Sequence, residues 1–262
     1  MRRLRIGDPP NQRSLRVRDE GESTKPALVC VHGAGSSSVM FMDVVRRLSP
    51  QRRVVAPDLP GHGQSDPWHP PSEVSIEMYR DAVGTVCAEL QLTRAVLLGH
   101  SMGALVALAA AAEWPERVAG LVLVNSGAKI KVAPEVFTRI ETDFPRFGKW
   151  FARLVWSPAT SLDTIERWGA VALTADQATT EADFRAVARF DATALLARIK
   201  TPTLVLGGAD DLSTPPKLSQ TLAAGIAGAR SVIVPEAGHM LAQEQPEIFF
   251  AELETFLIGA VT

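Results

Sequence analysis

The sequence predicts an α/β fold, in which a mostly parallel central sheet carries helices on both faces and a helical cap is inserted into the chain. First, short apolar runs alternate with longer helical patterns, an order that is typical of a parallel sheet covered on both faces. Second, this alternation stops between residues 128 and 198 and then resumes. Third, a length of 262 residues suits one α/β domain with an insertion.

The first half of the chain is expected to supply four parallel strands and the helices between them. The strands are predicted at Ala27–Val31, Val54–Ala56, Ala95–Leu98 and Val118–Val124. The helices are predicted at Val39–Leu48, at Val74–Leu90, which Ser72 would open, and from Ala104 to a stop before Pro115. The pattern around Leu15–Arg18 also favours antiparallel edge strands.

Residues 128–198 are expected to form the helical cap, or lid, on a core made of residues 1–127 and 199–262. The cap contains nine of the sixteen aromatic residues: Phe137, Phe144, Phe147, Phe151, Phe184, Phe190, Trp150, Trp156 and Trp168. Aromatic side chains in a lid are expected to line an apolar pocket. A small helical layer also needs such side chains for a core of its own.

Behind the insertion, the core pattern resumes. A strand is predicted at 203–206, followed by a helix from Pro215 behind a Thr214 N-cap. A last strand is expected at Val232–Val234, and a C-terminal helix from Pro246 would bury one apolar face.

Composition and charge narrow the class of protein. The formal net charge of -2 argues against nucleic acid or an anionic membrane as a partner. Cys30 and Cys87 are expected to be buried, reduced thiols rather than a disulfide framework. No secretory signal or membrane-spanning apolar run is visible, so a cytoplasmic location is expected. The sequence leaves the choice between monomer and homodimer open.

The segment Gly99–Gly103, Gly-His-Ser-Met-Gly, is the strongest chemical signal. It follows an apolar strand pattern and leads into an Ala-rich helix pattern. A serine on such a sharp strand-to-helix turn exposes its hydroxyl above the sheet, and the turn needs nearly side-chain-free positions two residues before and after. Gly99 and Gly103 meet that need. Ser101 is therefore the candidate nucleophile.

His239 is the candidate base. A serine hydroxyl needs a base and an orienting carboxylate, which in this fold type follow in the chain order Ser, acid, His. His239 lies just past the last predicted strand, after Gly238. Of the other histidines, His100 is too close to Ser101 to turn onto its hydroxyl, and His69 lies in a Pro-rich loop. His32 and His62 lie in glycine-rich turns.

The candidate acid lies in the loop after the penultimate strand, where Asp210 and Asp211 are adjacent. Asp211 stands three residues after Gly208 and is favoured over Asp210, with turn capping as the other role for either residue. The position after the fourth strand, an alternative site for the acid, reads Asn125-Ser126 and has no carboxylate.

Two backbone N–H groups are expected to hold the oxyanion of a tetrahedral intermediate. One belongs to Met102, directly after the nucleophile, and the other to Ala34 in the loop after the first parallel strand. Gly33 and Gly35 flank Ala34 and allow the backbone to turn into the site. His32 is expected to fasten this loop rather than to react.

Taken together, these motifs give the chain a clear resemblance to the α/β-hydrolase superfamily, in its capped serine esterase or carboxylesterase-like branch. The matching segments span almost the whole chain: His32–Gly35, Pro57–Ser65, Gly99–Gly103, Gly208–Asp211 and Gly238–His239. The resemblance implies a Ser101–His239–Asp211 triad, no organic cofactor and no metal. It also implies that Asp58 and His62 belong to a structural turn. Branches with an Asp nucleophile are disfavoured because Ser101 occupies the elbow.

The resemblance predicts hydrolysis of small-molecule carboxylic esters with small to medium apolar acyl groups, through an acyl-enzyme. Gly33, Trp150, Trp156 and Met240 are the candidate substrate-pocket residues. Several activities of the same triad stay open: acyl transfer, carbon–carbon bond hydrolysis, enol-lactone hydrolysis and cofactor-free haloperoxidation. A ligand sensor that keeps the triad without turnover is the alternative from another class.

Overall fold

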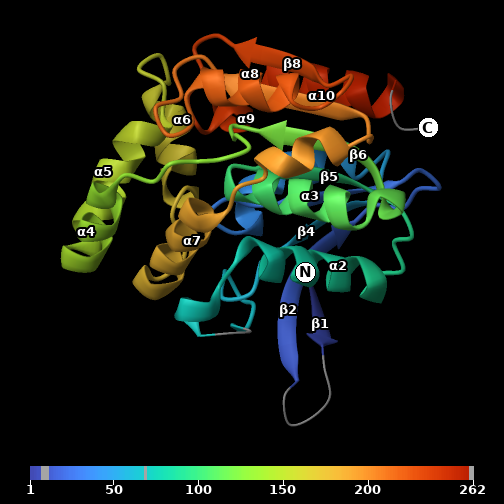
Figure 1. Cartoon of the computed structure of the whole chain (residues 1–262), viewed down its shortest axis with the longest axis horizontal. Helices are drawn as coiled ribbons and strands as arrows, with labels where there is room; N and C mark the ends of the chain where they lie inside the picture. The colour runs from blue at the N-terminus through green and yellow to red at the C-terminus, as the bar shows by residue number, and fades with distance from the viewer. Residues whose placement is uncertain (7–11, 68–69, 260–262) are drawn as a thin grey trace.

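An eight-stranded sheet forms the centre of the protein in a computed structural model, which describes residues 1–6, 12–67 and 70–259. The strand order is β1-β2-β4-β3-β5-β6-β7-β8. β1 pairs with β2, and β2 with β4, in antiparallel register, whereas the other neighbours are parallel (Figure 1). The expected α/β-hydrolase fold with its antiparallel edge strands is confirmed.

The strands lie close to their predicted positions. Their bounds are β1 Arg2–Ile6, β2 Arg13–Glu20, β3 Ala27–Val31, β4 Val54–Pro57, β5 Ala95–His100, β6 Val118–Val124, β7 Thr203–Gly208 and β8 Arg230–Val234. Side chains of β3 alternate between the two faces: Val29 and Val31 pack on one side, Leu28 and Cys30 on the other. Both faces are apolar because helices cover both.

Two helix layers cover the sheet. The core helices are α1 Met42–Leu48, α2 Ile76–Glu89, α3 Met102–Glu113, α8 Pro216–Ala224, α9 Leu241–Glu244 and α10 Pro246–Gly259. α2, α3 and α8 pack on one face, and α1 and α10 on the other. No helix in the described ranges is long and apolar enough to cross a bilayer.

Helix starts were the least accurate part of the prediction. α2 begins at Ile76 behind Ser75, whose side chain accepts from the Met78 N–H, while Ser72 lies in a preceding 3-10 turn. The first helix is also split, with a 3-10 turn at Ser38–Phe41 before α1. Ser72 and Ser75 both fit an N-cap by residue type, so residue type alone does not show which of them begins α2.

The chain between β6 and β7 is helical and is called the inserted segment here, residues 128–198. It contains α4 Pro134–Thr142, α5 Phe144–Val155, α6 Leu162–Trp168 and α7 Gln177–Arg189, with short 3-10 turns at Gly169–Val171 and Thr193–Arg198. In Figure 1 these helices lie to one side of the sheet, beside the end at which the parallel strands finish. Loops at the carboxyl ends of parallel strands are the usual place for a site in such a sheet.

Candidate active site

Ser101 lies on a strained turn between β5 and α3. Its backbone has φ 53° and ψ -116°, in a region that side-chain-bearing residues seldom adopt. A Cβ on Gly99 would collide with the Gly103 carbonyl, and one on Gly103 would collide with the Val31 carbonyl. The glycine spacing therefore permits the turn that holds Ser101 at the sheet edge.

His239 and Asp211 meet at the ends of β8 and β7. Nδ1 of His239 lies 2.8 Å from Oδ2 of Asp211, and both side chains are buried. A carboxylate can only accept, so Nδ1 carries a proton, and in the neutral imidazole the free lone pair is on Nε2. The histidine thus has the tautomer that a base facing a serine needs.

Asp211 is held by donors on every side. Its oxygens accept from Nδ2 of Asn125 at 2.6 Å, from the hydroxyl of Thr214 at 2.7 Å and from the N–H groups of Ser213 and Thr214 at 2.8 Å each. Burial raises the pKa of Asp211, but His239 and these hydrogen bonds outweigh it, and the pKa falls to about 2. Asp211 is therefore ionised at neutral pH.

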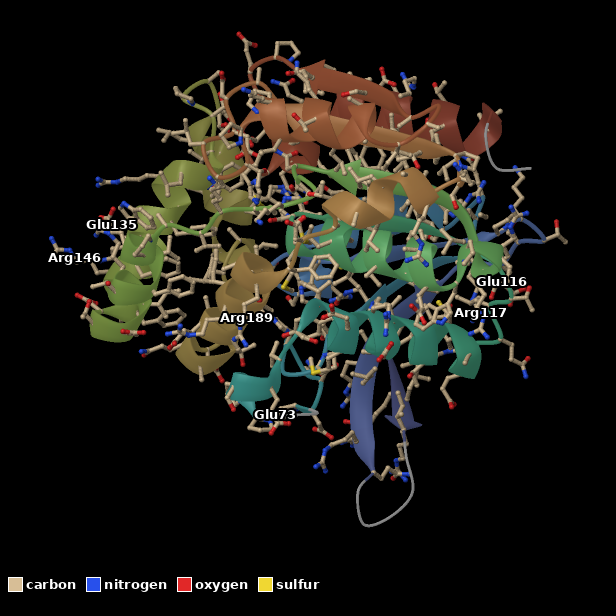
Figure 2. All side chains as sticks on the ribbon, viewed as in Figure 1. Glu73, Glu116, Arg117, Glu135, Arg146 and Arg189 are labelled. Atoms are coloured by element: carbon tan, nitrogen blue, oxygen red, sulfur yellow. The ribbon has the colours of Figure 1, made fainter. Side chains whose placement is uncertain are left out.

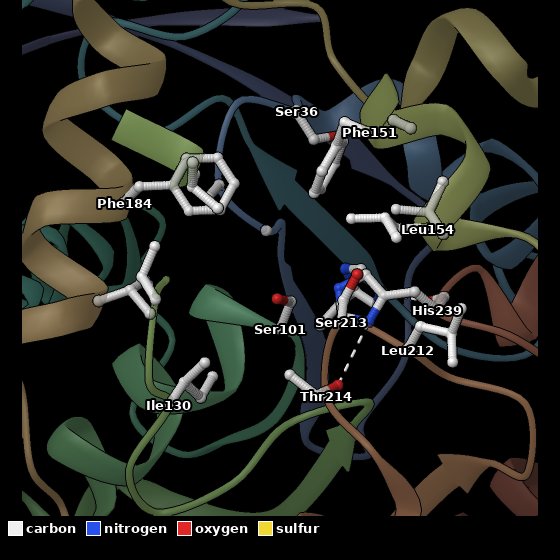
Figure 3. A pocket seen from close by; sticks show the side chains of 18 of the residues that line it. Ser36, Ser101, Ile130, Phe151, Leu154, Phe184, Leu212, Ser213, Thr214 and His239 are labelled. Carbon is white, nitrogen blue, oxygen red and sulfur yellow. Dashed lines mark hydrogen bonds between the residues drawn. The ribbon is translucent and has the colours of Figure 1, made fainter. Parts of the chain in front are cut away.

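Thr214 and Asn125 contact the candidate acid, and the sequence did not reveal either contact. Thr214 was predicted as the N-cap of the next helix, but α8 starts at Pro216 and the Thr214 side chain turns to Asp211 instead. Thr214 also lies 3.3 Å from Nδ1 of His239 (Figure 3). Asn125 additionally donates to the Gly238 carbonyl at 2.8 Å, which links β6 to the loop of His239.

Asp210 points away from His239. Its Oδ2 accepts from the Ser157 hydroxyl of the inserted segment at 2.6 Å. The neighbouring carboxylate Glu244 accepts from the N–H groups of Gly238 and Met240 through one oxygen, at 3.0 Å each. Its other oxygen accepts from the Ser157 N–H at 2.8 Å. These two carboxylates therefore join the inserted segment to the loops of Asp211 and His239.

Ser101 and His239 line the same cavity (Figure 3). Across the described residues, no hydrogen bond joins the Ser101 hydroxyl to His239. Such bonds are often long in unliganded sites and tighten when substrate binds. Ala34 also lines the cavity, and Met102 opens α3, where first-turn N–H groups lack an intrahelical acceptor.

The remaining histidines have defined places. His32 and His100 are buried, and burial as the leading cause lowers the pKa of each to about 3, so both are neutral. His100 donates through Nε2 to the His239 carbonyl at 2.8 Å. His62 lies outside the cavity in a buried polar cluster, and His69 lies outside the described residues.

The cavity measures about 270 Å³ and has a mostly apolar wall. Gly33, Trp150 and Met240, three of the four candidate pocket residues, line this cavity. Trp156 does not belong to the lining that the structure describes; it is buried in the apolar cluster with Trp168 and Ala237, so its pocket assignment is corrected. The charged side chain of Arg146 extends from the outer side of the inserted segment (Figure 2), whereas Glu135 and Lys131 of this segment belong to the cavity lining.

Further lining residues come from several separate elements, and apart from the aromatic content of residues 128–198 no sequence pattern marks them. The apolar ones include Ile130, Phe151, Leu154, Phe184, Val187 and Leu212. In Figure 3, Phe151 and Phe184 extend toward the cavity from the helices above Ser101.

Comparison with known proteins identifies the family. Residues 28–253 match the model of the alpha/beta hydrolase family, and the chain belongs to that family. A pimeloyl-[acyl-carrier protein] methyl ester esterase from Neisseria meningitidis is 30% identical over 243 residues, which cover 87% of this chain and 92% of the relative.

Solved structures agree with this assignment. A thermophilic esterase from Thermogutta terrifontis superposes with a TM-score of 0.89 at 28% identity, with 100% of both chains covered. An enol-lactonase from Burkholderia xenovorans LB400 gives a TM-score of 0.85 at 27% identity, covering 94% of this chain and 97% of the lactonase. The predicted superfamily and its esterase-like character are confirmed.

Proposed function

We propose that this hydrolase cleaves carboxylic esters of small to medium apolar acids, with Ser101, His239 and Asp211 as its triad. The observation that carries the proposal is the Asp211–His239 hydrogen bond of 2.8 Å at the wall of the apolar cavity that Ser101 also lines. The similarity to two esterases supports the ester as the substrate class.

In this mechanism His239 Nε2 takes the Ser101 proton as the hydroxyl oxygen attacks the ester carbonyl. The N–H groups of Ala34 and Met102 stabilise the oxyanion, and each such donor contributes on the order of 10²–10³ in rate. His239 then protonates the departing alcohol. A water activated by the same histidine releases the acid from the acyl-enzyme, while Asp211 stabilises the charged imidazole.

The inserted segment acts in this proposal as a cap that supplies one wall of the acyl site. Trp150, Phe151 and Phe184 of this segment lie along the cavity, which suits an apolar acyl chain. The cytoplasmic location and the small-molecule substrate expected from the sequence are part of the same proposal.

A decisive assay measures hydrolysis of nitrophenyl esters of increasing acyl length by the wild type and by Ser101→Ala. We expect turnover by the wild type and a loss of at least 10³-fold in kcat in the variant. Ser213→Ala, which removes another hydroxyl at the same cavity, is the matched control and should keep most of the activity. Equal turnover by Ser101→Ala and the wild type would exclude the triad.

Enol-lactone hydrolysis is a second candidate, favoured by the similarity to the lactonase. A lactone is an internal ester, so the same attack on its carbonyl breaks the ring C–O bond. The leaving enol oxygen takes the proton from His239 and stays attached to the acyl-enzyme through the carbon chain. Comparing kcat/KM for an unsaturated lactone with that for an open-chain ester of the same carbon number would decide between the two substrate classes.

A further inference from the structure

Asp183, on α7 of the inserted segment, is a fully buried carboxylate that the proposed reaction does not use. It is surrounded by donors from three parts of the core. Its Oδ2 lies 2.8 Å from the Gly35 nitrogen and 2.8 Å from Nε2 of His62, and its Oδ1 accepts from the Tyr79 hydroxyl at 2.5 Å. The carboxylate thus joins α7 to the candidate oxyanion loop, to the 58–65 loop and to α2.

The protons of this cluster follow from its geometry. Nδ1 of His62 lies 3.1 Å from the Pro60 carbonyl, and Nε2 faces the Asp183 carboxylate. Both partners accept only, so both nitrogens donate and His62 is positively charged. Burial, the largest single cause, lowers the pKa of His62, but Asp183, the Pro60 carbonyl and Asp58 together outweigh it and raise the pKa. The charges of His62 and Asp183 therefore balance each other within the core. The remaining lone pairs of the Asp183 carboxylate accept from the Gly35 N–H and the Tyr79 hydroxyl.

The loop beside this pair carries the candidate oxyanion donor. The Gly33 carbonyl accepts from Nδ1 of His32 at 3.0 Å and from the Ser36 N–H at 3.2 Å. That carbonyl and the Ala34 N–H lie in one rigid peptide plane, so holding the carbonyl aims the N–H. His32 in turn accepts the Leu59 N–H at 3.0 Å.

The next two peptides of the loop are held from the inserted segment. The Gly35 N–H donates to Asp183, and the Gly35 carbonyl accepts from the N–H groups of Thr174 and Ala175 at 2.7 and 2.9 Å. Asp183 and Gly35 are 148 positions apart in the sequence. The backbone on both sides of Ala34 is thus fixed, from the core on one side and from the inserted segment on the other.

We propose that Asp183 is a positioning residue of the oxyanion hole. Its carboxylate fixes the Ala34–Gly35 peptide, while the core fixes the Gly33–Ala34 peptide that carries the Ala34 N–H. Together the two hold the backbone angles of Ala34, so the hole is complete only when α7 is docked. The proposal rests on the proposed ester hydrolysis at Ser101. A donor displaced by a fraction of an ångström loses much of its effect on the transition state, whereas it affects binding of the ground-state ester much less.

The test compares Asp183→Ala with Asp183→Asn. The alanine variant removes the acceptor for Gly35, and we expect kcat on nitrophenyl butyrate to fall by about 10²-fold while KM changes by less than about twofold. The asparagine side chain keeps one oxygen for the Gly35 N–H and should restore kcat to within about tenfold of the wild type. Inhibition by a trifluoromethyl ketone should weaken as kcat/KM falls, because its Ser101 adduct carries the oxyanion.

The control is Asp176→Ala at the N-cap of the same helix, which removes the oxygen that accepts from the Thr179 N–H. This variant should lower the melting temperature without changing kcat. The proposal is wrong if Asp183→Ala is folded at the assay temperature and retains the wild-type kcat, since Asp183 would then only fasten the segment. Should the alanine variant fail to fold, Asp183→Ser, which leaves room for a water, replaces it with the same expectations.

The two proposals fail in different ways. If the wild type does not turn over any ester, the proposed function is wrong. The affinity of the trifluoromethyl ketone for the wild type and the Asp183 variants would still show whether the carboxylate orders the oxyanion site. If the wild type is active and every Asp183 variant matches it, only the positioning role is wrong.

Discussion

Asp210 and Asp211 show how strongly two adjacent residues of one type can differ. Asp211 is buried and accepts from His239, Asn125 and Thr214. Asp210 instead accepts from Ser157 of the inserted segment. Successive side chains in an irregular loop point in different directions, so one residue can orient His239 and the next can tie down the inserted segment.

Substituting each of these aspartates by asparagine should therefore separate the two roles. We expect Asp211→Asn to lower kcat by roughly 10³–10⁴-fold, because an amide can stabilise the wrong tautomer of His239 and cannot balance its charge. Asp210→Asn should lower kcat by less than about tenfold and should mainly reduce the melting temperature. Steady-state kinetics and thermal unfolding of the two variants measure this. A larger loss of kcat in Asp210→Asn would reverse the assignment of the acid.

For single residues, the sequence predicts a role only where the neighbouring residues mark it. Ser101 and His239 were predicted because their neighbouring glycines and preceding strand patterns mark the turns that they need. The partners of Asp211 and Asp183 carry no such cue. Asn125 reaches Asp211 across 86 positions, and His62 reaches Asp183 across 121. Only the folded sheet brings these pairs together.

At the scale of elements, the carboxylate of Glu244 fixes the loop of residues 235–240, which carries the candidate base His239. All four hydrogen-bond partners of Glu244 are donors: the N–H groups of Gly238, Met240 and Ser157, and the hydroxyl of Thr160. One oxygen serves the loop of His239 and the other serves the inserted segment. Glu244 belongs to the short helix α9, so this helix links the loop of His239 to the inserted segment.

Glu244→Gln should disrupt this coupling, because an amide NH₂ cannot accept hydrogen bonds and two of the four donors lose their partner. A buried donor left without a partner costs about 1–3 kcal/mol. We therefore expect a clear drop in melting temperature and a loss of kcat of about tenfold or more as the loop of His239 loosens. The measurements are thermal unfolding and nitrophenyl ester turnover below the melting temperature.

Glu247→Gln is the matched control, since the Glu247 side chain is 86% exposed and contacts only Arg47 among the ion pairs that the structure describes. It should change neither quantity appreciably, because exposed ion pairs contribute about 0–1 kcal/mol. If Glu244→Gln behaves like this control, the loop does not depend on the carboxylate.

The accuracy of the predicted elements follows the same logic. β3 and β6 match their predicted bounds because continuous apolar runs of that length fit a strand buried on both faces. The start of α2 was placed too early because Ser72 and Ser75 are equally good caps by type. The absence of strand patterns predicted that residues 128–198 would be helical, and their aromatic content suggested a pocket wall. Composition could not decide which aromatic side chains face the cavity: Trp150 lies in its lining, whereas Trp156 does not.

At the scale of the whole molecule, the cavity lies between two separately built layers. The sheet edge supplies Ser101, Ala34 and His239, and the inserted segment supplies much of the apolar wall. In the proposed mechanism the reacting side chains come from the core, while the size of the acyl site depends on the cavity-facing side chains of the segment. Changes to those side chains should therefore alter which acyl chains fit without removing the chemistry, whereas a change at Asp183 should act on the oxyanion hole.

Phe184→Ala tests this division. Phe184 lines the cavity and packs edge-on against Phe147 and Phe151, with ring centroids 6.0 and 5.8 Å apart. Removing the ring lengthens the acyl site, and each methylene newly buried contributes about 0.8 kcal/mol. Two extra methylenes should therefore raise kcat/KM for a longer ester relative to butyrate by about tenfold. The assay is a chain-length series of nitrophenyl esters, run below the melting temperature of the variant.

The matched control is Phe137→Ala, which removes the same side chain from the same segment. Phe137 lies against Arg185, with the guanidinium carbon 4.9 Å from the ring centroid, and it is not part of the cavity lining in the described chain. Its chain-length profile should match that of the wild type. An equal shift in both variants would mean that loosening of the segment, rather than the shape of its inner wall, selects the acyl group. No shift in Phe184→Ala would place the acyl chain elsewhere in the cavity.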